Sequence, residues 1–87
     1  MTDNAYTEEN KNKFKEIIGL THREFQCVEL LSNGNSAKVI AKKLNISYRT
    51  VEAHFSNIMH KLGCKNRYSI LKIYFNNQIQ NNSYKNK

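Results

Sequence analysis

The 87-residue sequence lacks features that mark several large classes of protein. It has no apolar run long enough to cross a membrane, and its polar, acidic start (MTDNAYTEENKNKFK) does not resemble a secretory signal peptide. It contains no proline and no internal repeat. A chain of this length forms one domain and is too short for the large core and deep cleft of most enzymes. We therefore expect a single small domain in the cytoplasm.

Groups of residues that would support catalysis or metal binding are also missing. Cys27 and Cys64 have no CxxC partner, and we interpret them as thiols in a reducing compartment, with a disulfide between them left open. His60 and Cys64 are four residues apart, but Gly63 is expected to end the helix between them. No activated nucleophile, carboxylate pair or phosphate-binding glycine loop is present. The sequence therefore predicts no metal, no cofactor and no enzymatic activity.

Negative charge is scarce in the second half of the chain. Residues 1–35 carry six acids against four bases, whereas residues 36–75 carry eight bases against a single acid, Glu52. A concentrated positive surface binds polyanions, because neutralised phosphates release their counterions. Solvated lysines are the simpler explanation. The basic segment, however, coincides with a helical motif.

That motif is a pair of amphipathic helices within residues 36–62. Apolar residues recur at helical spacing in each helix, namely Ala37, Ile40, Ala41 and Leu44, then Val51, Phe55, Ile58 and Leu62. Asn45 can adopt the left-handed conformation that ends the first helix, and Ser47 is a good N-cap for the second. Two such helices that cross steeply at a tight turn form a helix-turn-helix.

Further helices are expected on both sides of the motif. Thr21 and Glu24 have the spacing of a capping box, which predicts a helix that ends near Gly34. Asn66 is the expected N-cap of a last helix, over residues 67 to about 77, whose apolar side chains cover more than half its circumference. The surplus is either covered by an N-terminal helix, which residues 8–18 could form, or is a surface for self-association. We expect an N-terminal extension (1–19, partly helical), one domain (20–79) and a flexible tail (80–87).

The sequence resembles a LuxR-type (GerE-like) helix-turn-helix domain over roughly residues 20–75. The matching stretches are LTHRE (20–24), LL (30–31), Gly34, SAKVIA (36–41), LNIS (44–47), TVEAH (50–54), KLG (61–63) and NR (66–67). The resemblance implies an all-α, four-helix domain that binds double-stranded DNA as a homodimer through its last helix and regulates transcription. Many members carry a receiver or ligand-binding domain, for which this chain has no room. It is expected to be a stand-alone regulator or a piece of a longer one.

The motif also predicts which side chains contact DNA. Base contacts are expected from the helix over about 48–62, in the major groove, at Glu52, Ala53, Ser56, Asn57 and His60. Phosphate contacts are expected at Lys38, Ser47, Arg49, Thr50, Lys61 and Arg67. The expected dimer interface is formed by Tyr68, Leu71, Ile73 and Phe75. Arg67 has a second, equally weighted interpretation, an ion pair with Glu24 or Glu29.

Two observations keep other interpretations open. Glu52 stands where the family frequently has a lysine, and a carboxylate there can accept from a cytosine amino group, which suggests a distinct target sequence. Region 4 of sigma factors shares an L-x-x-R-E start and a helix-turn-helix. The alternative function is therefore an interaction module that contacts RNA polymerase or another regulator through the apolar last helix.

Overall fold

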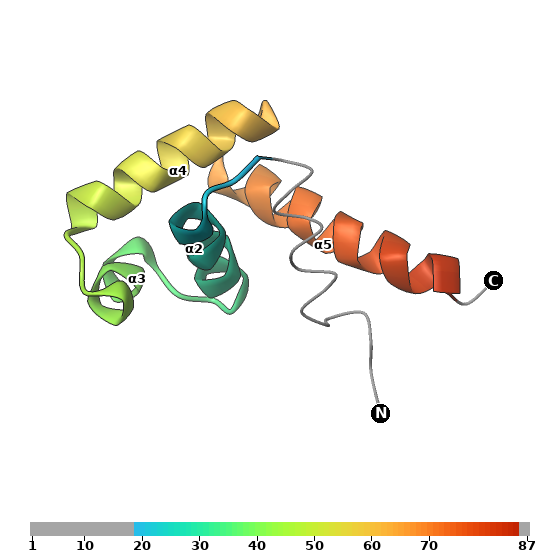
Figure 1. Ribbon diagram of the computed structural model, residues 1–87, viewed down its shortest axis with the longest axis horizontal. Coiled ribbons are helices and arrows are strands. Elements are labelled where there is room, and N and C mark those ends of the chain that lie inside the picture. Colours follow the sequence, from blue (N-terminus) through green and yellow to red (C-terminus); the bar gives the residue numbers. More distant parts are fainter. Residues whose placement is uncertain (1–18, 86–87) are drawn as a thin grey trace.

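The computed structural model describes the backbone of residues 19–85 and the side chains of residues 19–77. It contains four helices, α2 (His22–Ser32), α3 (Ala37–Leu44), α4 (Tyr48–Leu62) and α5 (Arg67–Lys85), and no strand within residues 19–85. Figure 1 shows α4 lying across α2, with α3 near the start of α4. The all-α, four-helix prediction is confirmed. The helix expected within residues 8–18 lies outside the described residues.

Each helix is preceded by a residue whose side chain accepts a hydrogen bond from a backbone N–H in the first turn. The Thr21 hydroxyl accepts from the Glu24 backbone N–H at 3.1 Å, while the Glu24 carboxylate accepts from the Thr21 N–H at 2.9 Å. This reciprocal pair is the predicted capping box. At α3 and α4 the cap is a single hydrogen bond, which the Ser36 hydroxyl accepts from the Val39 N–H and the Ser47 hydroxyl accepts from the Thr50 N–H. At the start of α5 the Asn66 side chain accepts from the Ser69 N–H.

Two helices end in the left-handed conformation at the residues expected to stop them. Asn45 follows α3 with φ +59°, and Gly63 follows α4 with φ +70°. Asparagine and glycine tolerate this conformation better than other residues, because it brings a Cβ close to the backbone. The short turn between Asn45 and Ser47 sets the direction in which α4 leaves α3.

The core lies where α2, α3 and α4 meet the first half of α5. Its fully buried side chains are Cys27, Val28, Ile40, Val51, Phe55, Ile58 and Ile70. Each large apolar side chain buried in this way stabilises the fold by roughly 1.5–3 kcal/mol. The Tyr74 ring of α5 meets the Phe25 ring of α2 edge-on, with 6.4 Å between centroids. These contacts anchor α5 through its first two turns.

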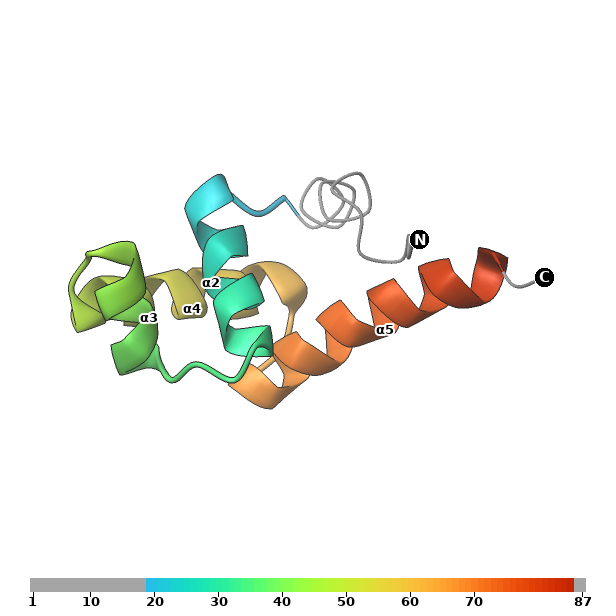
Figure 2. The same ribbon diagram turned by 90° about the horizontal axis from the view of Figure 1, so that it is seen from below.

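The rest of α5 projects away from the other helices, as Figure 2 shows. Within the described residues, no helix combines the length and apolarity needed to span a bilayer. On α5, Tyr68 in the first turn is 85% exposed, and Phe75, just after the two anchored turns, is 39% exposed.

Candidate nucleic-acid interface

Helix α4 has one fully buried face and one exposed face. Val51, Phe55 and Ile58 have no exposed area, because they point into the core from successive turns. The opposite face carries small and polar side chains that are all exposed, namely Ala53, Ser56, Asn57 and His60. These are four of the five predicted base-contacting residues. The fifth, Glu52, is half-buried at the edge of this face.

The start of α4 adds a polar and positively charged surface. Ser47, Arg49 and Thr50 are exposed, and the Ser47 hydroxyl lies 2.9 Å from the Thr50 hydroxyl. The first turn contains no acidic residue. Unpaired N–H groups and the helix dipole make such an N-terminus attractive to phosphate. On α3, Lys38 is also exposed.

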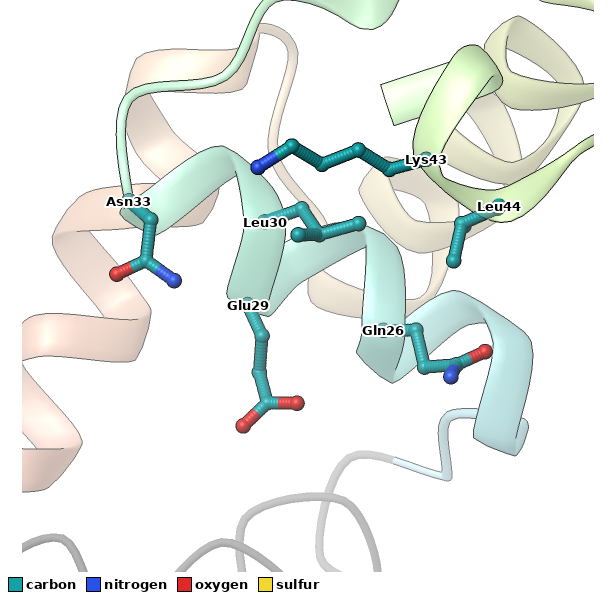
Figure 3. Close-up of a pocket in the computed structure, with 6 residues that line it drawn as sticks. All are labelled: Gln26, Glu29, Leu30, Asn33, Lys43 and Leu44. Atoms are coloured by element: carbon teal, nitrogen blue, oxygen red, sulfur yellow. The ribbon is translucent and has the colours of Figure 1, made fainter. Parts of the chain in front are cut away.

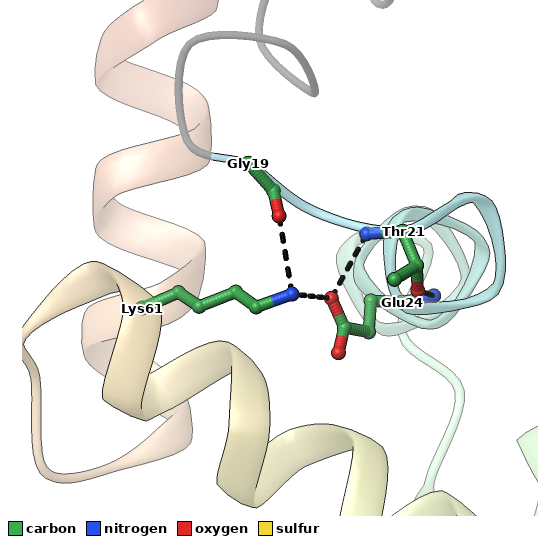
Figure 4. Close-up of polar contacts among 4 residues, drawn as sticks. All are labelled: Gly19, Thr21, Glu24 and Lys61. Atoms are coloured by element: carbon green, nitrogen blue, oxygen red, sulfur yellow. Dashed lines mark hydrogen bonds and ion pairs between the residues drawn. The ribbon is translucent and has the colours of Figure 1, made fainter.

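Lys61 lies in a different environment from these four residues. Its ammonium donates to the Glu24 carboxylate at 2.7 Å and to the Gly19 carbonyl at 3.1 Å, as Figure 4 shows. Glu24 is only 4% exposed. Burial by itself would raise the pKa of Glu24, but the hydrogen bonds from Lys61 and Thr21 outweigh burial and lower the pKa overall. The Lys61 charge, which was predicted to contact phosphate, is thus paired with a buried carboxylate, while its own side chain is 31% exposed.

Arg67 is also engaged, with a partner that the sequence did not indicate. Its guanidinium forms an ion pair with the Glu52 carboxylate, while the carboxylate of Glu24 is taken by Lys61. The guanidinium carbon also lies 4.6 Å from the centroid of the Phe55 ring. The hydrogen bond from Arg67 lowers the pKa of Glu52, against the opposing effect of burial. Arg67 therefore forms an ion pair, as one interpretation expected, but its partner is Glu52 and not Glu24 or Glu29.

Comparison with known proteins agrees with this geometry. Residues 19–73, more than half of the chain, match the family described as bacterial regulatory proteins, luxR family. The chain belongs to the LuxR family. No solved structure matches it significantly.

The LuxR-family relatives are much longer proteins. VanR, a transcriptional activator protein of Vibrio anguillarum, is 50% identical over 52 residues, which cover 60% of this chain and 22% of VanR. TdiR, a transcriptional regulatory protein of Thauera aromatica, is 42% identical over 62 residues, or 70% of this chain and 27% of TdiR. FixJ, a transcriptional regulatory protein of Azorhizobium caulinodans, is 50% identical over 48 residues, or 55% of this chain and 23% of FixJ. The matched part thus spans about a quarter of each relative.

Helix α5 of this LuxR-type domain exposes an apolar stripe. Tyr68, Leu71 and Phe75 follow one another at spacings of three and four residues, which places them on one side of the helix, where Tyr68 and Phe75 are exposed and Leu71 is half-buried. Ile73, the fourth residue of the expected interface, instead packs against the core beside Ile70. The wide apolar surface of α5 is therefore two surfaces, one turned toward the core and one left exposed.

A pocket of about 400 Å³ lies between α2 and α3, and none of its lining residues was predicted to contact DNA or to form the dimer interface. It is lined by Gln26, Glu29, Leu30, Asn33, Lys43 and Leu44. Figure 3 shows the Lys43 side chain extending across toward α2. Its mixed polar and apolar lining includes no residue of α4. The pocket therefore does not contribute to the exposed face of that helix.

The cysteines and potential metal ligands are dispersed. Cys27 and Cys64 are both free thiols, one buried and one half-buried, and burial raises the pKa of the Cys27 thiol. In the described part of the chain, no three His, Cys, Asp or Glu side chains form a group that could hold a metal ion.

Proposed function

We propose that this LuxR-type domain binds double-stranded DNA sequence-specifically as a homodimer and regulates transcription, with α4 in the major groove. The observation that carries the proposal is the two-sided character of α4. Its inner face is held by the core, and its outer face is small, polar and flanked by exposed cations. An α-helix with such a face fits the width of the major groove.

The exposed face of α4 supplies the base contacts in this proposal. Ala53 offers a methyl group to a thymine methyl, and the amide of Asn57 can both donate and accept at an adenine. Ser56 and His60 can hydrogen-bond to base edges at the centre and the end of the contact. Glu52, at the side of the face, accepts from a cytosine amino group.

Four exposed side chains supply the phosphate contacts that fix the register of the domain on the duplex. They are Lys38 on α3 and Ser47, Arg49 and Thr50 around the start of α4. Lys61 and Arg67 are left out of this set, because their charges are engaged by Glu24 and Glu52. We expect Arg49→Glu to abolish duplex binding, whereas Lys65→Glu, an equal charge change in the loop before α5, weakens it less.

The apolar stripe of α5 supplies the dimer contact. Tyr68, Leu71 and Phe75 on one subunit would meet the same residues on another across a two-fold axis, which buries both stripes. Phe75→Glu should shift sedimentation equilibrium toward the monomer and weaken binding to a two-half-site duplex. Lys72→Glu on the same helix is the matched control. An unchanged dimer in Phe75→Glu would contradict this interface.

Selection of bound duplexes from a random pool, followed by sequencing, tests the proposal as a whole. A recovered motif with two related half-sites supports it, and a chain that binds no duplex at low salt contradicts it. The same α5 stripe also favours a second candidate function, contact with RNA polymerase or another regulator. That function is supported if Arg49→Glu retains binding to such a partner after it has lost duplex binding.

A further inference from the structure

Arg67 connects the start of α5 to the side of α4 that would face DNA. It is the first residue of α5, and its partner Glu52 lies in the second turn of α4. Its guanidinium lies over the ring of Phe55, which is fully buried and therefore fixed in position. A planar guanidinium can stack on an aromatic ring and donate from its edge at the same time, which a lysine ammonium cannot do.

These contacts restrict the Glu52 carboxylate. Arg67 donates to it from the first residue of α5, across 15 residues of chain. An ionised carboxylate accepts hydrogen bonds only, at about four lone-pair positions, so the bond from Arg67 can be kept while a further donor binds. The positive charge of Arg67 also offsets the repulsion that an acid would meet beside DNA phosphates.

We propose that Arg67 is a positioning residue for base recognition, which holds the Glu52 carboxylate as an acceptor for a cytosine amino group in the major groove. The inference rests on the proposed function, because it assumes that α4 enters that groove. A cytosine presents an amino donor there, whereas a guanine presents only acceptors, which would repel the carboxylate. An adenine has an amino group beside the N7 acceptor, so it suits a carboxylate less well. A residue of α5 would thus set part of the target sequence without touching a base.

A phosphate contact by Arg67 predicts different behaviour. Phosphate contacts affect all sequences alike and add to the dependence of binding on salt. A positioning role affects discrimination at one base pair and leaves the salt dependence unchanged when the charge is kept. Arg67→Lys separates the two roles, because it keeps the charge and removes the stacked, planar donor.

The experiment uses the full chain and the duplex recovered by selection. The base pair read by Glu52 is first identified as the one at which Glu52→Ala loses discrimination. Binding of duplexes altered at each position is then measured for wild type, Glu52→Ala, Arg67→Lys, Arg67→Gln and the double variant Glu52→Ala/Arg67→Gln. Lys65→Gln, which removes one charge from the adjoining loop, is the control for charge. Circular dichroism confirms that each variant is folded.

We expect wild type to discriminate about tenfold at that base pair, and both Arg67 variants to approach the level of Glu52→Ala there. The other positions and the salt dependence of Arg67→Lys should match wild type, and Arg67→Gln should cause no further loss of discrimination in the Glu52→Ala background. If both Arg67 variants discriminate as well as wild type, the inference is wrong but the proposed function stands. The same holds if wild type is selective and Glu52→Ala keeps all of its base preferences. A wild type without any sequence preference overturns the proposed function itself.

Discussion

Within residues 19–77, two acid–base pairs join α4 to the other helices, and they differ mainly in the exposure of the acid. At the end of α4, Lys61 pairs with Glu24, whose side chain is 5% exposed, while near its start Glu52 pairs with Arg67, and its side chain is 36% exposed. Removing Lys61 leaves the buried Glu24 carboxylate poorly solvated, whereas the exposed Glu52 carboxylate is rehydrated when Arg67 is removed. The same chemistry is therefore expected to contribute more to stability at the end of α4 than near its start, where the proposed function assigns Glu52 to recognition.

The largest expected effect is that of Lys61→Met on stability. The substitution leaves the buried Glu24 carboxylate without its cation, and we expect a loss of about 2–3 kcal/mol in the free energy of unfolding. Urea denaturation measures the loss. Adding Glu24→Gln should restore part of it, and Lys65→Met, at an exposed position, should change little. Unchanged stability with a weaker salt dependence of duplex binding would show that Lys61 contacts phosphate.

A second expected effect is the response of the Glu24 pair to acid. The folded pKa of Glu24 is below its ordinary value of 4.5, so the unfolded chain takes up the proton first as the pH falls. The contribution of Glu24 to stability is therefore complete above about pH 4.5 and is lost as the pH falls through the folded pKa. Denaturation between pH 3 and pH 7 should show a shallower acid dependence in Glu24→Gln than in wild type. Equal slopes would show that Glu24 contributes nothing to the acid response.

Arg67→Gln should affect stability less than Lys61→Met does. Its ion pair with Glu52 is more than a third exposed on both sides, so we expect a loss of about 1 kcal/mol or less, with some of it from the contact with Phe55. Urea denaturation under the same conditions makes the comparison direct. A loss as large as that of Lys61→Met would remove the distinction between the two pairs.

The smallest expected effect is a difference between the two ion pairs in how strongly salt weakens their coupling energy. Coupling energies from double-mutant cycles should fall for Glu52–Arg67 between 0.05 and 0.5 M NaCl, because ions screen exposed charges over a distance of roughly 4–14 Å in that range. The Glu24–Lys61 coupling should change by less, since Glu24 is shielded from solvent. Equal sensitivity in the two cycles would mean that exposure does not separate the pairs.

Much of the domain could be predicted from short-range pattern. The capping box at Thr21 and Glu24, the left-handed Asn45 and the apolar side of α4 all depend on residues within a few positions of one another. Helical periodicity alone could not divide the apolar surface of α5. Ile73 and Phe75 were expected on one interface, and they lie on different sides because α5 packs against α2 and α4 through only one of them.

By itself, the sequence determined where the four helices begin, where α3 and α4 end, which side of α4 is buried and where positive charge concentrates. The end of α5 was expected near residue 77, and the helix runs to Lys85. Caps, turns and periodicity act over three or four residues, so a linear pattern contains them. Only the tertiary structure decided which charged side chains of residues 19–77 are paired within the protein and which are left without an ion-pair partner. Lys61 meets Glu24 across 37 residues of chain, and Arg67 meets Glu52 across 15. These pairs depend on how whole helices pack against one another, and a pattern of neighbouring residues does not contain that information.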